Sequence, residues 1–373
     1  MAERTGVSSM SNSIYEDKGL IAELTARIAA ISRQPLTVME VCGTHTMSIA
    51  QSGLRSLLPE HLRLISGPGC PVCVTDATLI SAALALARHP DVTLTTFGDM
   101  LRVPAGEYSL QTLREQGADV RLVLSPLDAL ELAQAQPRRQ VVFFAVGFET
   151  TAPLTASTLE LAYELGLSNF SVLSAHKTMP AALRALLGGS TRVGALLCPG
   201  HVAAVTGADS FGFVSRELGL PAAVAGFTPV EILLAVAAVV EMKEAGRAYL
   251  ANCYQRAVRP EGNPAARAAL ERVFVPCDAN WRGLGPIPGS GLALREEFAE
   301  FDAARRFGEV IAVGTVYRDH PGCCCGAVLR GELAPAGCPL FGGECTPRHP
   351  CGACMVSSEG SCAAAYRYRE VGP

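Results

Sequence analysis

The sequence predicts an α/β protein with two parallel-sheet βαβ domains facing a cleft, followed by a loop-rich C-terminal domain that holds a metal site. Two observations lead to this class. Short apolar runs alternate with helical stretches about every 25 residues, which is typical of parallel strands joined by helices. Eight of the 14 cysteines lie between residues 323 and 362 among Gly and Pro turns, and this density indicates metal binding.

Composition narrows the classes of function. The 373 residues are 49% hydrophobic and 18% charged, which suits two or three domains with packed cores. The net charge of −4 and the scattered Lys and Arg give no electrostatic support for nucleic-acid binding. We expect no membrane association, because the apolar stretch 232–240 is too short to span a bilayer. Fourteen cysteines without an export signal in the polar segment 1–13 predict a soluble protein of the reducing cytoplasm.

The expected elements follow in order along the chain. Apolar residues at helical spacing predict a first amphipathic helix over 15–31. The expected strands are 36–41, 62–65, 92–96, 120–124, 141–146, 170–173, 195–197 and 222–225. Long helices are expected over 76–88 and 229–250.

Two stretches of the chain suggest domain boundaries. The polar segment 134–140 separates the first four strands from the last four, and the segment 251–266 contains Pro260, Gly262 and Pro264. The resulting division is an N-terminal helix at 1–35, an α/β domain with Cys42, Cys70 and Cys73 at 36–137, a second α/β domain at 138–255, and a C-terminal metal-binding domain at 256–373.

Residues that directly follow the strands are the first candidates for function, because ligands bind beyond the carboxyl ends of parallel strands. Three of the seven histidines and four of the six cysteines outside the C-terminal cluster occupy these turns. They are His45, His176 and His201, and Cys42, Cys70, Cys73 and Cys198. Two sheets that present such edges to each other would enclose a polar, thiol-lined cleft.

The C-terminal cysteines offer a four-thiolate site. Cys325, Cys338, Cys345 and Cys362 are separated by 12, 6 and 16 residues, and four thiolates on loops can hold a [4Fe–4S] cluster. A structural zinc site is the alternative, since Cys351 and Cys354 have the two-residue gap found in zinc knuckles. Spacing alone leaves both open.

Two further thiol motifs follow strands of the first half. Cys70 and Cys73 form a Cys-x-x-Cys pair before a helix, which favours a dithiol/disulfide couple over two unreactive thiols on a rigid turn. Cys42 has His45 three residues later, which fits a nucleophile–base pair or a metal ligand, or alternatively a buried thiol beside a surface histidine.

The turn 147–151 contains Glu149 but lacks the Lys and the glycine spacing of a phosphate-binding loop. A polar wall, with Thr150 or Thr151 capping the next helix, is the simpler interpretation. His176, Lys177 and His201 could orient ligands or donate protons, and each alone is also compatible with a structural role.

Taken together, these segments resemble the HypD family of [NiFe]-hydrogenase maturation factors. The resemblance covers nearly the whole chain, and so many uncommon strings in one order make chance agreement improbable. The strings are 39–45, 67–74, 97–104, 147–151, 199–202, 281–285, 340–342 and 355–360.

The resemblance implies three domains with a [4Fe–4S] cluster in the last. It implies a redox-active assembly scaffold, rather than a conventional turnover enzyme, that works with a small HypC-type partner. The product would be an Fe(CN)₂CO unit, with cyanide delivered by a HypE-type partner.

The resemblance also assigns roles to residues. It makes Cys42, beside His45, the ligand of the Fe(CN)₂CO iron and Cys70 with Cys73 the redox pair. His45, His201 and Glu149 join the redox pair as candidate catalytic residues. Its cluster ligands fall on Cys325, Cys338, Cys345 and Cys362, which leaves Cys323, Cys324, Cys351 and Cys354 as additional thiols.

Two other functions compete with this one. A freestanding oxidoreductase would use the cluster and the Cys-x-x-Cys pair to reduce a disulfide. A structural zinc protein would use its thiols only to hold a partner-binding surface.

Overall fold

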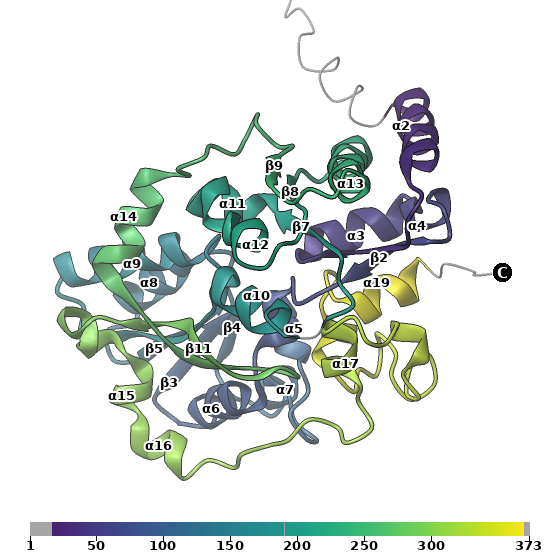
Figure 1. The fold of residues 1–373 in the computed structure, drawn as a ribbon. Coiled ribbons are helices and arrows are strands. Elements are labelled where there is room, and N and C mark those ends of the chain that lie inside the picture. The colour runs from purple at the N-terminus through teal and green to yellow at the C-terminus, as the bar shows by residue number, and fades with distance from the viewer. Residues whose placement is uncertain (1–16, 190, 369–373) are drawn as a thin grey trace, which may run out of the picture. The chain divides into compact units, whose positions relative to one another are not determined.

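The computed structural model describes residues 17–189 and 191–368 and divides into two units. Of the described residues, the first unit comprises 17–69, 187–189, 191–262 and 367–368, and the second comprises 70–186 and 263–366. Each unit is built on a parallel sheet of its own, as the ribbon in Figure 1 shows. The predicted α/β class is confirmed, whereas the cleft between the sheets stays a prediction.

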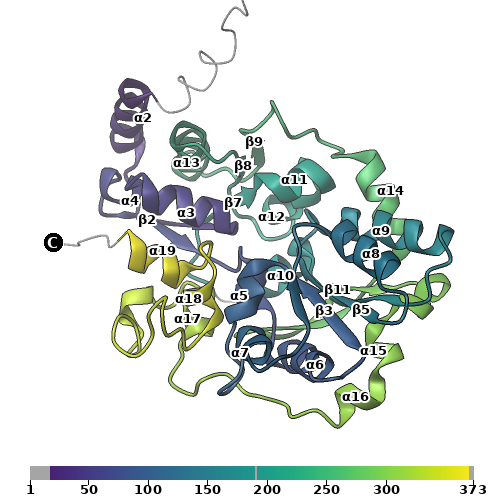
Figure 2. The same ribbon diagram turned by 180° about the vertical axis from the view of Figure 1, so that it is seen from behind.

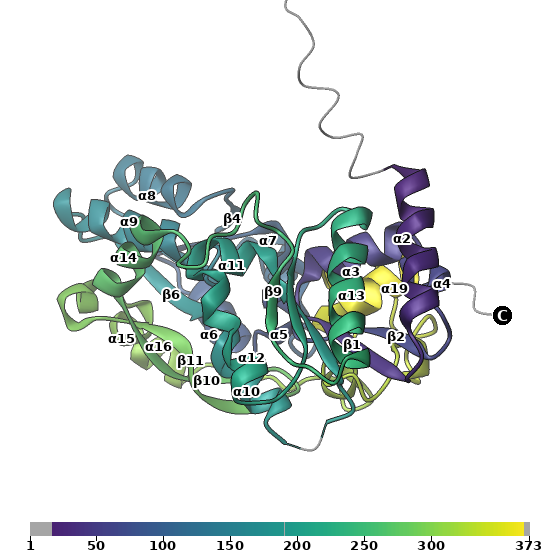
Figure 3. The same cartoon turned by 45° about the horizontal axis from the view of Figure 1, so that its top comes forward.

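The first unit contains a parallel sheet with the strand order β2-β1-β7-β8-β9. Its strands are β1 (Leu36–Glu40), β2 (Leu62–Ser66), β7 (Ala195–Pro199), β8 (Ala222–Ala225) and β9 (Leu250–Asn252). Helices α2 (Lys18–Ile31) and α13 (Pro229–Glu244) run side by side in Figure 3 and share one apolar core with β1. The other helices of the unit are α3 (Gly43–Gln51), α4 (Leu54–Leu57), α11 (Gly200–Thr206), η3 (Ala208–Phe211) and α12 (Phe213–Arg216).

The second unit contains a parallel sheet with the order β4-β3-β5-β6. Its strands are β3 (Val92–Thr96), β4 (Val120–Leu122), β5 (Gln140–Gly147) and β6 (Phe170–His176). Helices α8 (Pro126–Ala135) and α9 (Ala152–Glu164) lie together in Figure 2 and bury Phe143 and Phe170 of the sheet in a second core. Between residues 70 and 187 the other helices are α5 (Pro71–Val74), α6 (Ala77–Ala87), η2 (Gly98–Arg102), α7 (Leu110–Glu115) and α10 (Met179–Leu187).

The segment predicted to be loop-rich contains an antiparallel hairpin, β10 (Phe274–Trp281) and β11 (Gly285–Leu294). Pro276 in β10 and the prolines and glycines of β11 obscure the alternation that normally predicts a strand. Short helices make up most of the remaining regular structure. They are α14 (Pro264–Val273), η4 (Glu296–Phe301), α15 (Ala303–Arg306), α16 (Gly308–Ala312), α17 (Cys325–Leu329), η5 (Pro335–Gly337), α18 (Ala353–Val356) and α19 (Ser361–Arg367).

The strand pairing differs from the predicted division at 134–140. β4 and β5 flank that segment and lie in the same sheet, whereas β7 pairs with β1 from the start of the chain. A polar connection marks a turn but does not identify which strands pair, because the pairing depends on distant residues. Cys42 therefore belongs to the first unit, while Cys70 and Cys73 begin the second.

Two helix boundaries also differ from expectation. Asp17 caps α2 through hydrogen bonds from the amides of Gly19 and Leu20, so the helix begins at Lys18, and residues 15–16 lie outside the described part. Helix α13 ends at Glu244 rather than at residue 250, because Gly246 takes a left-handed conformation with φ +61° and the chain then enters β9. Within residues 17–189 and 191–368, no helix has the length and apolar character needed to cross a bilayer.

Candidate functional site

In the first unit, the Cys42 thiol stands at the junction of β1 and α3. Cys42 is the N-cap residue of α3, and it is 8% exposed. The fully buried Glu40 carboxylate accepts a hydrogen bond from the Cys42 amide at 3.0 Å and another from the Thr46 hydroxyl at 2.5 Å. Burial raises the pKa of Glu40, while hydrogen bonds from Ser66, Thr46 and the Cys42 amide oppose the rise. Glu40 thus fixes the backbone that carries the thiol, a role that the sequence did not reveal.

The turn after β2 closes against Cys42. The Gly43 amide donates a hydrogen bond to the Gly69 carbonyl at 2.9 Å. A Cβ atom on Gly69 would lie 2.2 Å from the Cys42 nitrogen, so only glycine permits this approach. The two motifs that the sequence singled out around residues 42 and 69 are therefore in direct contact.

His45 and His201 meet at the ring of Phe227. The ring centroids lie 4.8 Å apart for His45 and Phe227, and 3.8 Å apart for His201 and Phe227. His45 is fully buried, and burial lowers its pKa to about 4, so the ring is neutral at pH 7. Its Nε2 lies 2.9 Å from the Gly226 carbonyl, which can only accept, so Nε2 carries the proton. Nδ1 is left as a lone-pair acceptor without a partner among the described residues.

The Cys70–Cys73 pair lies at the start of α5 in the second unit. Cys70 is the N-cap of α5, and its sulfur accepts a hydrogen bond from the Cys73 amide at 3.3 Å. The Cys73 thiol is buried and hydrogen-bonds to Cys354 and Cys70, and burial is the main reason why its pKa lies well above the usual value.

Cys354 connects this pair to the C-terminal thiols, and the sequence analysis left it without a specific role. Hydrogen bonds from the Cys325 and Cys73 thiols lower the pKa of the buried Cys354 to about 7. The pKa of Cys325 is raised despite a hydrogen bond from Cys323, because Cys325 donates to Cys354 and is buried. A continuous set of thiols, Cys70, Cys73, Cys354, Cys325 and Cys323, therefore runs through the second unit.

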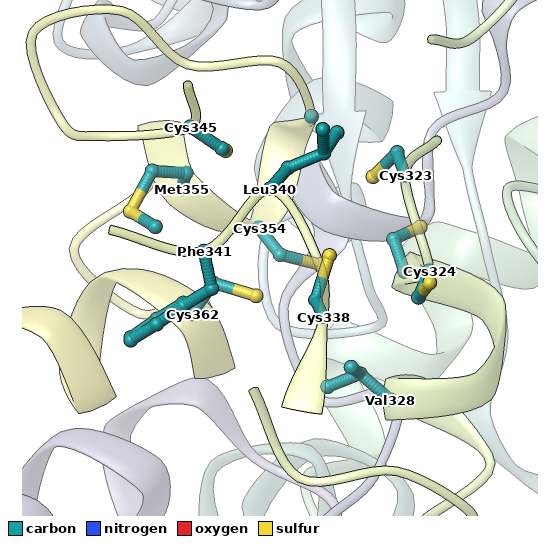
Figure 4. Close-up of a pocket in the computed structure, with 12 residues that line it drawn as sticks. Cys323, Cys324, Val328, Cys338, Leu340, Phe341, Cys345, Cys354, Met355 and Cys362 are labelled. Atoms are coloured by element: carbon teal, nitrogen blue, oxygen red, sulfur yellow. The ribbon is translucent and has the colours of Figure 1, made fainter. Parts of the chain in front are cut away.

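The C-terminal cysteines surround one pocket, shown in Figure 4, with about 340 Å³ of empty space including solvent at its mouth. The four predicted ligands all line it. The other lining residues are Cys323, Cys324, Cys354, Val328, Leu340, Phe341, Gly352 and Met355. In Figure 4 the sulfur atoms of Cys338, Cys354 and Cys362 point toward a common space. Cys351 lies just outside, where its amide donates to the Cys345 sulfur at 3.3 Å.

The donor set of this pocket suits an iron–sulfur cluster. Its polar side chains are thiols, its remaining walls are apolar, and iron–sulfur clusters are bound by thiolates in such surroundings. Within the described part of the chain, no three His, Cys, Asp or Glu side chains are arranged to bind a single metal ion. The thiols of this pocket are therefore candidate ligands for such a cluster.

Glu149 follows β5 and His176 ends β6, and both are buried at the same sheet edge. Glu149 Oε1 accepts a hydrogen bond from the Met179 amide at 2.9 Å, whereas Oε2 has no partner among the described residues. Burial raises the pKa of Glu149 to about 7 and lowers that of His176 to about 4. Glu149 also lines an open cavity beside α10 together with Ile287.

Lys177 and Arg282 are two buried cations beside these groups. Lys177 donates to the Asn280 carbonyl at 2.7 Å and lies 5.6 Å above the Trp281 ring, and burial lowers its pKa to about 8. Arg282 is 3% exposed and donates from Nε to the Thr75 carbonyl at 3.0 Å. The sequence showed Arg282 only as part of a motif, because nothing in the local pattern predicts its burial.

The fold and these sites define an α/β protein with contacting buried thiols and a cysteine-lined C-terminal pocket. The HypD family, described as "Hydrogenase formation hypA family", matches residues 19–369. The chain is 46% identical over 364 residues to the hydrogenase maturation factor HypD of Azotobacter vinelandii, covering 95% of each chain. It is 44% identical over 352 residues to HypD of Escherichia coli (strain K12), covering 94% of each chain.

A more distant relative extends the comparison. A putative hydrogenase expression/formation protein of Methanocaldococcus jannaschii is 38% identical over 358 residues, covering 95% of this chain and 99% of that one. The chain therefore belongs to the HypD family of hydrogenase maturation factors, and the resemblance stated from the sequence motifs is confirmed.

Proposed function

We propose that this chain is a cytoplasmic, redox-active scaffold on which the Fe(CN)₂CO unit of [NiFe] hydrogenase is assembled. It would act with a small HypC-type partner and receive cyanide from a HypE-type partner. Membership of the HypD family carries the proposal, and the thiol set of the second unit supports its redox part.

Cys42 is the proposed ligand of the cargo iron. Low-spin iron that carries cyanide and CO is a soft metal centre and accepts thiolate, and a thiolate of the HypC-type partner would complete a bridge. The Cys42 amide is held by Glu40, and the turn at Gly69 packs against the Cys42 backbone, so the backbone that carries the thiol has a fixed position. Neutral His45 offers a lone pair at Nδ1 that could accept a proton.

Cys70 and Cys73 are the proposed source of reducing equivalents. Release of cyanide from a thiocyanate requires two electrons: one thiocyanate and two thiols give one thiol, hydrogen cyanide and one disulfide. A Cys70–Cys73 disulfide would be left behind and must be reduced again. Cys354 is suited to attack its Cys73 sulfur, because the two residues are in contact. The attack would break the Cys70–Cys73 bond, release the Cys70 thiolate and leave a Cys73–Cys354 disulfide.

Cys325, Cys338, Cys345 and Cys362 are the proposed ligands of a [4Fe–4S] cluster, which when bound supplies electrons one at a time. The hydrogen bond from Cys325 to Cys354 gives Cys325 a second possible duty as the disulfide partner of Cys354. Cys323 lines the same pocket and would then be the fourth ligand. Loss of the brown colour in Cys323→Ala with its retention in Cys325→Ala would favour that arrangement, and the reverse result would favour Cys325.

The test of the whole proposal is infrared spectroscopy of the chain co-expressed with its HypC-type partner and the cyanide-delivery proteins. We expect cyanide and CO stretching bands that disappear in Cys42→Ala while the cluster absorbance persists. Cys253→Ala is the control, since this half-buried thiol of the same unit lies against the core. Bands that survive in Cys42→Ala would refute the iron site, and a colourless, zinc-loaded protein would favour the structural alternative.

The freestanding oxidoreductase remains the competing function. It predicts turnover of a disulfide substrate by the isolated, cluster-loaded chain, with no dependence on Cys42. Turnover that requires Cys70 and Cys73 but is unchanged by Cys42→Ala would favour it over the scaffold.

A further inference from the structure

A buried cation lies between the two thiol-bearing segments of the second unit. Arg282 directly follows β10, and its side chain is 1% exposed. Its Nη1 lies 3.4 Å from Asp319 Oδ1, and Asp319 is 44% exposed. Its Nη2 has no hydrogen-bond partner among the described residues. A buried guanidinium whose carboxylate partner is half-exposed to solvent is only partly neutralised.

One side of Arg282 contacts the segment of the redox pair. Its amide donates to the Val74 carbonyl at 2.9 Å, and its Nε donates to the Thr75 carbonyl at 3.0 Å. Val74 directly follows Cys73 in the chain, and an antiparallel bridge joins Thr75 to Trp281. The guanidinium is therefore anchored at the end of the short helix that carries Cys73.

The other side of the turn contacts the pocket cysteines. Gly283 takes φ +74°, and a Cβ there would lie 2.5 Å from the Gly326 Cα and 3.5 Å from the Cys325 carbonyl carbon. Arg330 donates to the Gly283 carbonyl at 2.8 Å, which ties the turn to the end of α17. The charge of Arg282 acts on the Cys325 thiol across this contact. Two glycines thus allow a fixed cation to approach the thiols.

We propose that Arg282 is an electrostatic positioning residue that makes the group bound by the pocket cysteines easier to reduce. The inference rests on the proposed cluster of the C-terminal pocket. Thiolates and cluster together carry negative charge, and each added electron makes the unit more negative. A fixed, buried positive charge stabilises the reduced form more than the oxidised form, because little water is present to screen it. No proton transfer is required, and a chemical reductant supplies the electron in the test.

The reduction potential of the purified, cluster-loaded chain tests this assignment, read from the visible absorbance of the cluster during a redox titration. We expect Arg282→Gln to lower the equilibrium constant for reduction about tenfold or more, which is about 59 mV for a one-electron couple. Arg282→Lys should stay near the wild type, because it keeps the charge while changing the hydrogen bonds.

Two further variants separate charge from packing. Arg330→Gln removes an equal charge nearby, but Arg330 is exposed and paired with Glu332 at 2.9 Å, so its effect should be much smaller. Asp319→Asn removes the exposed partner of Arg282 and should shift the potential in the opposite direction, upward. This surface substitution does not depend on whether Arg282→Gln takes up the cluster.

The outcomes decide between the inference and the function on which it rests. Unchanged potentials in Arg282→Gln and Asp319→Asn, with the cluster intact, would overturn the inference alone. An equal fall in Arg282→Lys and Arg282→Gln would mean that packing, and not charge, sets the potential, and would overturn it too. A wild-type protein that binds no cluster would overturn the inference together with the cofactor assignment.

Discussion

Replacing Gly69 with alanine should displace Cys42 and destabilise the first unit. The new Cβ would lie 2.2 Å from the Cys42 nitrogen and 2.5 Å from its Cα, whereas real Cβ atoms keep at least 3.0 Å from such atoms. Both obstacles are backbone, so the two segments must separate by at least about 0.8 Å, the difference between 3.0 and 2.2 Å.

The free-energy cost combines two effects. Overpacking costs about 1–3 kcal/mol, and the hydrogen bond from the Gly43 amide to the Gly69 carbonyl contributes about 1 kcal/mol. We therefore expect Gly69→Ala to lower the free energy of unfolding by about 2–4 kcal/mol. A shift of about 1 Å at a reacting group can also reduce its activity about 100-fold, so assembly of the iron unit should nearly cease.

Urea unfolding measures the stability, and infrared spectroscopy of the co-expressed complex measures the assembly. Gly189→Ala is the matched control in the same unit, because its Cβ would meet nothing within 4 Å and should cost little. If Gly69→Ala unfolds at the wild-type urea concentration and keeps full infrared bands, the close contact between the two turns is wrong.

Two other predictions concern the second unit. The contribution of Glu149 to stability is fully present below its unfolded pKa of 4.5 and is lost as pH rises to its folded pKa of about 7. The contribution of His176 has the opposite sign: it is fully present above its unfolded pKa of 6.5 and is lost as pH falls to its folded pKa of about 4. Between pH 4.5 and 6.5, Glu149→Gln should therefore make the free energy of unfolding rise more steeply with pH, by up to about 1.4 kcal/mol per pH unit, and His176→Gln should make it rise less steeply. Urea titrations at several pH values would detect this, and equal slopes in both variants would contradict the assigned burial. Cys354→Ser should slow the re-reduction of an oxidised Cys70–Cys73 pair while the cluster colour persists. Thiol alkylation followed over time measures the rate of re-reduction, and an unchanged rate would show that Cys354 does not take part in it.

Local pattern predicted the strands well. The runs at 92–96 and 222–225 match β3 and β8 residue for residue, because buried parallel strands are short and rich in apolar and β-branched residues. The local sequence pattern did not predict which strands pair, since the pairing of β1 with β7 depends on the packing of segments far apart in the chain. The β10–β11 hairpin escaped detection because its prolines and glycines obscure the alternation of its side chains.

The candidate site residues were likewise predicted only where their chemistry is visible in the local sequence. Motif spacing identified Cys42 and the Cys70–Cys73 pair, because their chemistry is visible in the residue types. Cys354 was treated as an additional thiol, since its contact with Cys73 joins residues 281 positions apart in the chain (354 minus 73). Glu40 was missed for another reason: a carboxylate inside a strand shows no sequence sign that it holds a neighbouring amide.

The pairing of β1 with β7 has a consequence for the newly made chain. Val38 opposes Ala195, so after Val38 a further 157 residues (195 minus 38) must leave the ribosome before the first sheet can close on that side. Until then one edge of β1 lacks its neighbour, while the four strands of the second unit's parallel sheet are already available to fold. We therefore expect the surroundings of Cys42, the proposed ligand of the cargo iron, to form late in biosynthesis, after the segment of the Cys70–Cys73 pair has begun to fold.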